Sequence, residues 1–157
     1  ASDSSFEIRQ IFRHKKRFLD LLLLADEQES MIDLYLERGE MFALYDQNIL
    51  KTICVVTDEG GKTIELKNIA TDPQYQKQGY GKRLIRFISE HYAGKYDTLL
   101  VGTGESPLTI PFYAQNGFKY SHRIKDFFTD NYDHPIYEDG KQLVDMVYLR
   151  KELSKSK

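Results

Sequence analysis

Apolar and polar residues alternate in several stretches of the chain, and this alternation is typical of half-buried β-strands. Residues 6–11 show the pattern first. Residues 40–45, 49–57 and 63–71 then read as strands, separated by short turns of polar residues and glycine. The pattern predicts an N-terminal strand and, further on, an antiparallel meander of three strands.

Two short helices are expected between the first strand and the meander. Phe18 and the leucines that follow it predict a helix with a strongly apolar face, which we interpret as a core face rather than a partner-binding stripe. Asp26 and Glu29 have the spacing of a capping box, and Gly39 is a helix stop signal. The second helix is therefore expected to run through Leu36.

A strand, a helix and a strand follow one another after the meander. The helix carries apolar residues at Leu84, Ile85 and Ile88 and is expected to end at Gly94. Residues 98–101 form a short apolar run that predicts a buried strand. This order implies a right-handed crossover and parallel pairing of the two strands.

Glycine and proline divide the remainder of the chain. The glycines in residues 102–104 predict a break in the strand, and the Ser-Pro pair at 106–107 predicts a helix start. We expect this helix to end at the Asn-Gly pair at 116–117. Further strands are predicted over residues 118–124 and 143–149, and the residues beyond the last strand are expected to be frayed.

Composition indicates an ordinary globular protein, and we expect a single domain over residues 1–157. There are 22 Lys and Arg residues against 24 Asp and Glu residues, so no overall field favours nucleic acid, and any anion site must be local. Cys54 is the single cysteine, which excludes an internal disulfide, and its apolar run indicates a buried thiol. With no long apolar run and no signal-peptide pattern, we expect a soluble cytoplasmic protein without a membrane partner.

Residues 65–84, with the sequence ELKNIATDPQYQKQGYGKRL, join a strand to a helix through a loop that contains Gly79 and Gly81. N–H groups at a helix start lack intrahelical partners, and glycine lets a ligand approach the main chain closely. Four basic residues cluster here, namely Lys77, Lys82, Arg83 and Arg86. They could bind an anion, and a solvated helix face is the alternative. The stretch predicts a phosphate site. Its glycine spacing is not that of a dinucleotide-binding turn. It is not a P-loop either, because Lys82 is followed by Arg83 and not by the Ser or Thr that follows the lysine of a P-loop.

Two motifs give this site a family resemblance. Residues 76–81, QKQGYG, match the Gln/Arg-x-x-Gly-x-Gly/Ala signature, preceded by a matching strand over residues 68–73, and residues 112–118, FYAQNGF, match a second signature. The chain resembles the GNAT superfamily of acetyl-CoA-dependent N-acetyltransferases. The resemblance implies an α+β fold whose mixed, mostly antiparallel sheet is splayed between its fourth and fifth strands and flanked by helices.

The resemblance also implies a set of residues that bind acetyl-CoA, with no metal. Main-chain groups of Ile69 and Thr71 would contact the acetyl and pantetheine portions. A backbone N–H group near Ala70 or Thr71 would meet the oxyanion. Main-chain N–H groups would hold the pyrophosphate at Gln76, Lys77, Gln78, Gly79, Tyr80, Gly81 and Lys82. Many relatives have an Asn after the fifth strand where this chain has residues 102–106, so Thr103 or Ser106 could substitute. Asn116 could contact CoA or could be a helix C-cap.

Acetyl transfer from a thioester to an amine needs a neutral amine, a stabilised oxyanion and a proton for the departing thiolate. The resemblance places Tyr113 beside the sulfur as general acid, and a core aromatic is the alternative reading. Glu65 is the preferred general base, with a sheet-surface carboxylate as the alternative, and Glu105 and His122 are weaker candidates. Direct attack in a ternary complex needs no nucleophile from the enzyme.

The acceptor is not defined by any motif. We expect a primary amine of a small molecule, with a protein N-terminus or lysine, or a catalytically silent acetyl-CoA-binding module, as alternatives. Residues 127–137 combine aromatic side chains with carboxylates, which would suit a cationic amine, although they could equally form a small cluster of their own. The resemblance also makes a homodimer plausible, and no nucleic-acid partner is expected.

Overall fold

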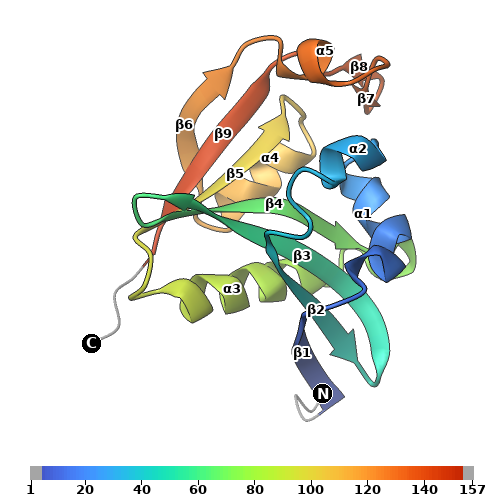
Figure 1. Ribbon diagram of the computed structural model, residues 1–157, viewed down its shortest axis with the longest axis vertical. Helices are drawn as coiled ribbons and strands as arrows, with labels where there is room; N and C mark the ends of the chain where they lie inside the picture. Colours follow the sequence, from blue (N-terminus) through green and yellow to red (C-terminus); the bar gives the residue numbers. More distant parts are fainter. Residues whose placement is uncertain (1–4, 154–157) are drawn as a thin grey trace. The chain divides into compact units, whose positions relative to one another are not determined.

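A computed structural model describes residues 5–153 as a mixed sheet with helices (Figure 1). The strands are β1 (Phe6–Ile11), β2 (Glu40–Asp46), β3 (Ile49–Gly60), β4 (Thr63–Thr71), β5 (Thr98–Gly104), β6 (Lys119–Ile124), β7 (Tyr137–Glu138), β8 (Lys141–Gln142) and β9 (Met146–Glu152). The α-helices are α1 (Leu19–Ala25), α2 (Glu29–Ile32), α3 (Tyr80–Tyr92), α4 (Thr109–Gln115) and α5 (Phe127–Asn131), and the 3₁₀ helices are η2 (Lys15–Phe18) and η3 (Pro73–Tyr75).

The main sheet has the strand order β1-β2-β3-β4-β5-β9-β6, and β7 and β8 form a separate hairpin. β4 and β5 are neighbours joined through α3, which is the predicted crossover. The α+β fold class is therefore confirmed. The splay between β4 and β5 stays a prediction.

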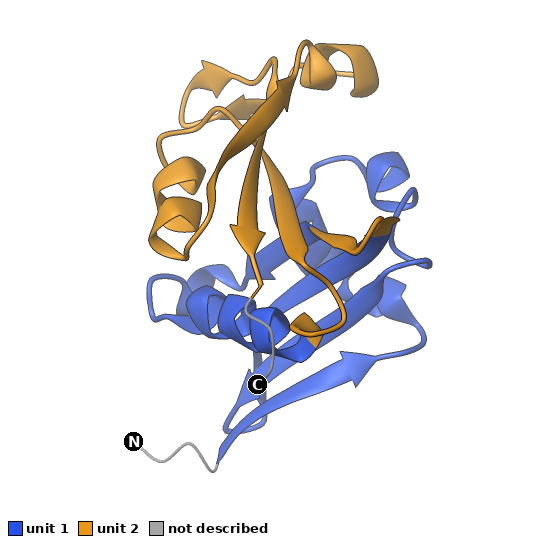
Figure 2. Ribbon diagram, turned by 90° about the vertical axis from the view of Figure 1, so that its left-hand side faces the viewer, with its two compact units in different colours: residues 1–58, 66–91 blue, residues 59–65, 92–157 orange. Residues whose placement is uncertain are grey.

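The chain divides into two compact units (Figure 2). Unit 1 consists of Ala1–Asp58 and Leu66–His91, and unit 2 consists of Glu59–Glu65 and Tyr92–Lys157. Each unit has its own helices and its own buried residues. A single domain over residues 1–157 stays a prediction.

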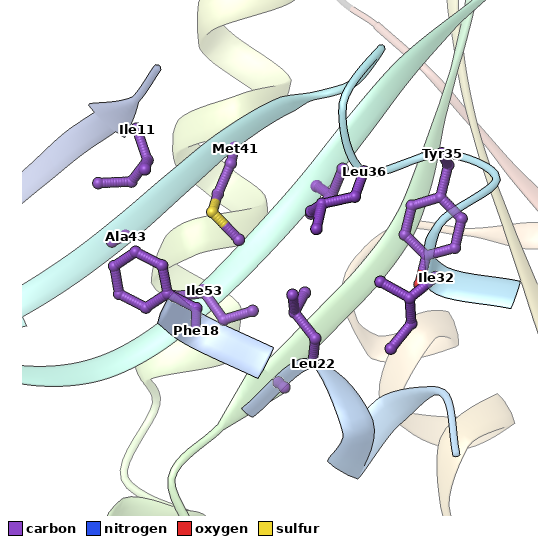
Figure 3. Packing of buried hydrophobic residues seen from close by; sticks show 11 residues of the cluster. Ile11, Phe18, Leu22, Ile32, Tyr35, Leu36, Met41, Ala43 and Ile53 are labelled. Atoms are coloured by element: carbon purple, nitrogen blue, oxygen red, sulfur yellow. The ribbon is translucent and has the colours of Figure 1, made fainter. Parts of the chain in front are cut away.

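In unit 1, β2 is covered on both faces because successive side chains of a strand point to opposite sides. Met41 and Ala43 pack with Leu22 of α1 in one buried cluster (Figure 3). Phe42, between them in sequence, meets Phe87 of α3 with the ring centroids 5.4 Å apart. The predicted core face of the leucine-rich segment and the predicted apolar face of α3 are both confirmed.

The predicted helix through Leu36 is wrong, because α2 ends at Ile32 and turns follow it. Asp26 does not form a capping box: it follows α1, and its carboxylate accepts a hydrogen bond from the Tyr35 hydroxyl at 3.1 Å. Gly39 also has another role, since a Cβ there would lie 2.6 Å from Cγ1 of Val55. The glycine permits a close approach of the chain to β3.

Lys15 explains why the chain can turn at this point without a continuous helix. Its side chain is buried, and Nζ donates hydrogen bonds to three carbonyl groups, those of Leu36 at 3.1 Å, Glu37 at 3.3 Å and Gly39 at 2.7 Å. A buried ammonium that is hydrogen-bonded in this way satisfies carbonyl groups that the turn leaves without helical partners. These hydrogen bonds join Lys15 to residues 21 to 24 positions further along the chain, so local sequence patterns do not reveal them.

In unit 2, β5 continues through Gly104, so the predicted break at residues 102–104 is wrong. The two glycines lie opposite large residues of β9, with Gly102 paired with Tyr148 and Gly104 with Met146. A Cβ on Gly102 would lie 3.0 Å from Cζ of the Tyr148 ring, and one on Gly104 would lie 2.5 Å from the Leu143 side chain. These glycines make room for packing and do not form a turn.

The last strand begins at Met146 rather than at residue 143 and continues through Glu152. Leu143 instead packs with Phe128 and Ile136 in a small buried cluster, which partly buried aromatic residues extend. The residues from 150 to 153 are also ordered into the fold, because the N–H group of Leu153 donates to the carbonyl of Asp97 at 2.9 Å. The frayed end predicted here therefore concerns only residues 154–157, which lie outside the described residues.

The helix predicted to start at residues 106–107 starts at Thr109. Ser106 Oγ accepts a hydrogen bond from the N–H group of Leu108 at 3.1 Å, so it stabilises the turn before the helix. The predicted end is confirmed, since Asn116 is the C-cap of α4 and Gly117 has φ +94°. Within residues 5–153, no helix is long and apolar enough to cross a membrane.

Replacing Lys15 with Met should lower the free energy of unfolding by about 1–3 kcal/mol, because three carbonyl groups would lose their donor. Lys16→Met is the matched control, since Lys16 is exposed and pairs with Glu29 and Asp33 at the surface, where ion pairs contribute little. Urea unfolding followed by circular dichroism measures both. Equal effects of the two substitutions would contradict the role of Lys15.

Candidate functional site

The glycine loop of unit 1 starts from a short capped turn. Asp72 is the N-cap of η3, and its carboxylate accepts a hydrogen bond from the N–H group of Gln74 at 3.0 Å. After the turn, Gln76 Nε2 donates to the carbonyl of Thr71 at 3.2 Å, which ties the loop back to the end of β4. Residues 76–79 are exposed. The loop is thus anchored at its start and open to solvent beyond it.

The loop enters α3 through left-handed backbone conformations, with φ +64° at Lys77 and φ +88° at Gly79. The carbonyl of Gly79 accepts the hydrogen bond of the Arg83 N–H group at 3.0 Å, so the N–H groups of the first helical turn precede the helical ladder. A Cβ on Gly79 would meet no atom within 4 Å, so the glycine is not required by packing. Its backbone angle and its open surroundings fit the close approach of an anionic group.

Both ends of this loop are held by Lys51, a buried residue of β3 that sequence reasoning missed. Its Nζ lies 3.3 Å from the ring centroid of Tyr75, before the loop, and 5.6 Å from that of Tyr80, the first residue of α3. The Tyr80 hydroxyl donates to Asp46 Oδ2 at 2.8 Å. Two tyrosines that flank a loop are the one sequence signal that could have suggested a cation between them.

The main-chain groups predicted to contact acetyl-CoA lie at the end of β4, also in unit 1. The Ala70 carbonyl accepts a hydrogen bond from Thr52 Oγ1 at 2.9 Å, and Thr71 Oγ1 donates to the same hydroxyl at 3.1 Å. Ile69 and Thr71 are partly exposed, whereas Ala70 is buried. The strand end is therefore held by the neighbouring strand β3, and its contacts with a ligand stay predictions.

The basic residues near the loop differ in their surroundings. Lys77, Lys82 and Arg86 are exposed, which leaves both the anion-binding reading and the solvated-face reading open. The Arg83 guanidinium lies 4.5 Å from the ring centroid of Phe6, so this residue also contributes to packing against β1.

Tyr113 lies in α4 of unit 2, where it is buried with its ring edge-to-face against Phe112 and Phe118. Burial raises the pKa of the Tyr113 phenol above its ordinary value, and the negative charge of Glu138 adds to the effect. The hydroxyl makes no hydrogen bond to any residue in the range 5–153, so it caps no backbone group there. Tyr113 therefore keeps its proton at neutral pH.

Glu65 lies in the part of β4 that belongs to unit 2, and only 6% of it is exposed, so it is not a solvated sheet-surface carboxylate. The Tyr148 hydroxyl donates a hydrogen bond to Glu65 Oε2 at 3.1 Å. Burial raises the pKa of Tyr148, and the neighbouring charge of Glu65 raises it further. Tyr148 is a second residue that sequence reasoning missed.

The two weaker candidates for the base are engaged at the surface of unit 2. The Glu105 carboxylate pairs with the Arg123 guanidinium at 3.3 Å, and this partner lowers the pKa of Glu105. His122 is exposed, and its ring stacks on that of Tyr148 with the centroids 4.8 Å apart. Both arrangements are consistent with structural roles.

Thr103 and Asn116 make contacts within unit 2. Thr103 Oγ1 lies 2.7 Å from Thr109 Oγ1, which joins β5 to the start of α4. Asn116 Nδ2 donates to the carbonyl of Phe112 at 2.7 Å, which fits the helix C-cap alternative. Contacts of these two residues with CoA stay predictions.

Cys54 is fully buried and burial raises the pKa of its thiol, so the prediction of a core thiol is confirmed. Across residues 5–153, no group of three or more His, Cys, Asp or Glu side chains could hold a metal ion.

The chain thus combines a mixed sheet, in which α3 connects β4 and β5, with a glycine loop at the start of that helix. The model of the acetyltransferase (GNAT) domain matches residues 37–120. The uncharacterized N-acetyltransferase YvbK of Bacillus subtilis (strain 168) is 39% identical over 137 residues, which are 85% of this chain and 88% of that protein.

Solved structures agree with the match. A GNAT family acetyltransferase from Elizabethkingia anophelis with acetyl-CoA bound has a TM-score of 0.87 and 33% identity, covering 96% of this chain and 99% of that one. A Bacillus subtilis acetyltransferase in complex with CoA has a TM-score of 0.85 and 35% identity, and the match covers 94% of this chain and 99% of that one. The chain belongs to the GNAT family and is an N-acetyltransferase, and acetyl-CoA is its acetyl donor.

Replacing Lys51 with Met should weaken CoA binding about threefold to tenfold, because the cation that holds Tyr75 and Tyr80 would be lost. Isothermal titration calorimetry with CoA measures the dissociation constant. Lys95→Met is the control, since it removes the same charge from an exposed turn after α3. Equal dissociation constants for both variants would contradict the role of Lys51 in the loop.

Proposed function

We propose that this N-acetyltransferase transfers the acetyl group to a primary amine of a small molecule, by direct attack of the amine in a ternary complex. The observation that carries the acetyl-CoA part of this proposal is the glycine loop, where Gly79 has φ +88° and no protein atom lies within 4 Å of the position of its missing Cβ. Such a loop at a helix start accepts a phosphate-containing ligand through main-chain N–H groups.

The proposal assigns the pyrophosphate to the main chain of residues 76–82, whose first-turn N–H groups precede the ladder of α3. Main-chain groups at Ile69, Ala70 and Thr71 would contact the acetyl and pantetheine portions. Thr103 and Asn116 are kept as further candidate contacts, although both already make hydrogen bonds within the protein. Bound acetyl-CoA supplies the activated thioester.

Glu65 is the proposed general base. An alkylammonium group has a pKa of about 10.4, so an acceptor amine must lose a proton before its lone pair can attack. In this step an N–H bond of the ammonium breaks and the proton moves to the Glu65 carboxylate. The burial of Glu65 supports the assignment, because opposite charges attract each other more strongly where water is excluded, so the carboxylate would draw in the ammonium form of the acceptor.

Tyr113 is the proposed general acid, which gives its phenolic proton to the departing thiolate. Burial and the charge of Glu138 both raise the pKa of Tyr113, so the phenol is protonated across the neutral range and becomes ionised only above its ordinary titration range. Its contacts with Phe112 and Phe118 hold the ring in one orientation.

A cationic acceptor is favoured by a second carboxylate in unit 2. Oε1 of Glu138 is buried and has no hydrogen-bond partner among residues 5–153. The charge of Glu138 acts on Tyr113, so this carboxylate is within electrostatic reach of the proposed acid. An unpaired buried carboxylate oxygen attracts an ammonium group.

Thiol release from acetyl-CoA in the presence of polyamines, amino acids, aminoglycosides and peptides tests the proposal. We expect turnover with a small primary amine and, in Tyr113→Phe, a roughly 100-fold lower kcat with an unchanged dissociation constant for CoA. Tyr120→Phe is the control, because it removes a hydroxyl from a tyrosine of unit 2 that is 59% exposed and has no assigned role. Turnover with peptides alone would support the protein-directed alternative. If no compound in the panel is acetylated and Tyr113→Phe behaves like the wild type, the catalytically silent acetyl-CoA-binding module is supported.

Gly79→Ala should raise the dissociation constant of CoA at least about tenfold, because a Cβ would stand between the ligand and the main chain. Gly60→Ala is a close control, since Gly60 has φ +86° and equally open surroundings but lies at the hairpin end of β3. Both variants carry similar backbone strain, of about 1–2 kcal/mol. Calorimetry with CoA separates the two, and equal loss of affinity would count against the assignment of the pyrophosphate to this loop.

A further inference from the structure

The hydrogen bond between Tyr148 and Glu65 joins residues that are 83 positions apart in the chain. Both residues belong to unit 2, with Tyr148 on β9 and Glu65 on the first part of β4. Tyr148 is 9% exposed and Glu65 is 6% exposed, so the bond is shielded from water. A hydrogen bond to an ionised group in such surroundings contributes more than one at the surface.

The ring of Tyr148 is held by the two strands that flank β9. On β5 the paired residue is Gly102, whose missing Cβ leaves a space that the ring occupies, since a Cβ would lie 3.0 Å from Cζ and 3.1 Å from Cε1. On β6 the paired residue is His122, whose ring is stacked at an interplanar angle of 3°. The hydroxyl therefore has a fixed direction, set by one small and one aromatic neighbour.

We propose that Tyr148 is a positioning residue, which holds the carboxylate of Glu65 in the orientation in which it takes the proton of the acceptor amine. The inference rests on the proposed function, in which Glu65 is the general base. A donor fixed by its own packing restricts the rotamers of the carboxylate, and a base must lie within hydrogen-bond reach of the proton that it abstracts. Tyr148 itself need not touch the substrate.

Other ionisable groups also act on this pair. His122 stacks on the Tyr148 ring, and the charge of Glu59, at the end of β3, also acts on Tyr148. A positioning role is therefore tested most directly by removing the hydroxyl of Tyr148 alone. The phenylalanine variant keeps the ring that packs over Gly102 and against His122.

The test compares Tyr148→Phe, Glu65→Gln and the double variant, with the amine that gives the fastest turnover in the panel. We expect Tyr148→Phe to lower kcat roughly tenfold and to leave the dissociation constant of CoA unchanged. In the Glu65→Gln background the same substitution should have almost no effect, because Tyr148 acts through Glu65. Tyr120→Phe, at a tyrosine of β6 that is 59% exposed, is the matched control.

A second measurement needs no acceptor. The carboxyl ¹³C resonance of Glu65, assigned by its absence in Glu65→Gln, can be titrated in the wild type and in Tyr148→Phe. A hydrogen bond donated to a carboxylate favours its ionised form, so its loss should move the titration midpoint to higher pH by roughly one unit. The acidic limb of the kcat/KM profile should move in the same direction, which a purely structural role of Tyr148 would not produce.

The outcomes separate the inference from the function on which it rests. If Glu65→Gln keeps full activity, the base assignment fails. If Glu65→Gln is impaired but Tyr148→Phe has a wild-type kcat and titration midpoint, the positioning role is overturned while the base assignment stands. Equal losses from Tyr148→Phe in both backgrounds would also overturn it.

Gly102→Ala is an independent variant, since its Cβ would lie 2.9 Å from Sδ of Met146 and 3.0 Å from Cζ of the Tyr148 ring, and would crowd the ring without removing the hydroxyl. It should reproduce the lower kcat and the higher titration midpoint. A wild-type midpoint in Gly102→Ala, in a variant that is folded by circular dichroism, would contradict the view that ring packing orients the hydroxyl.

Discussion

The pairing of β9 with β5 on one side and β6 on the other is the constraint on which the arrangement of Tyr148 and Glu65 in unit 2 depends. In this register Tyr148 lies opposite both Gly102 and His122, and its hydroxyl reaches Glu65. A shift of one residue would turn the Tyr148 side chain to the other face of the strand. The glycine in β5 is thus part of the same arrangement as the tyrosine, because a larger residue would occupy the space of the ring.

In unit 1, the corresponding constraint is that the glycine loop is open to solvent and is attached at both ends. Left-handed backbone angles at Lys77 and Gly79 turn the chain into α3, and the missing side chain of Gly79 leaves the main chain open at that position. The Lys51 ammonium lies close to Tyr75 on one side of this loop and faces Tyr80 on the other. The loop is exposed but attached at both ends, which reduces the entropy that a ligand would have to remove.

Much of the fold was predictable, since the first strand and β4 have the predicted bounds and α3 has the predicted buried face. Errors arose where one residue type serves two purposes. The sequence pattern favours a break at Gly102 and a helix stop at Gly39, although both glycines permit close packing. The segment around Phe128 was open to two readings, and its aromatic residues pack among themselves with Ile136 and Leu143.

The sequence by itself indicated the family and the acetyl donor, because the two motifs that carry the resemblance, residues 76–81 and residues 112–118, are each local in the chain. Only the tertiary structure decided which side chains act on one another. Glu65 and Tyr148 are joined by a bond across 83 positions, and Lys51 meets aromatic rings from two other elements. Such contacts depend on strand register and on the burial of distant residues, and neither leaves a pattern in adjacent residues.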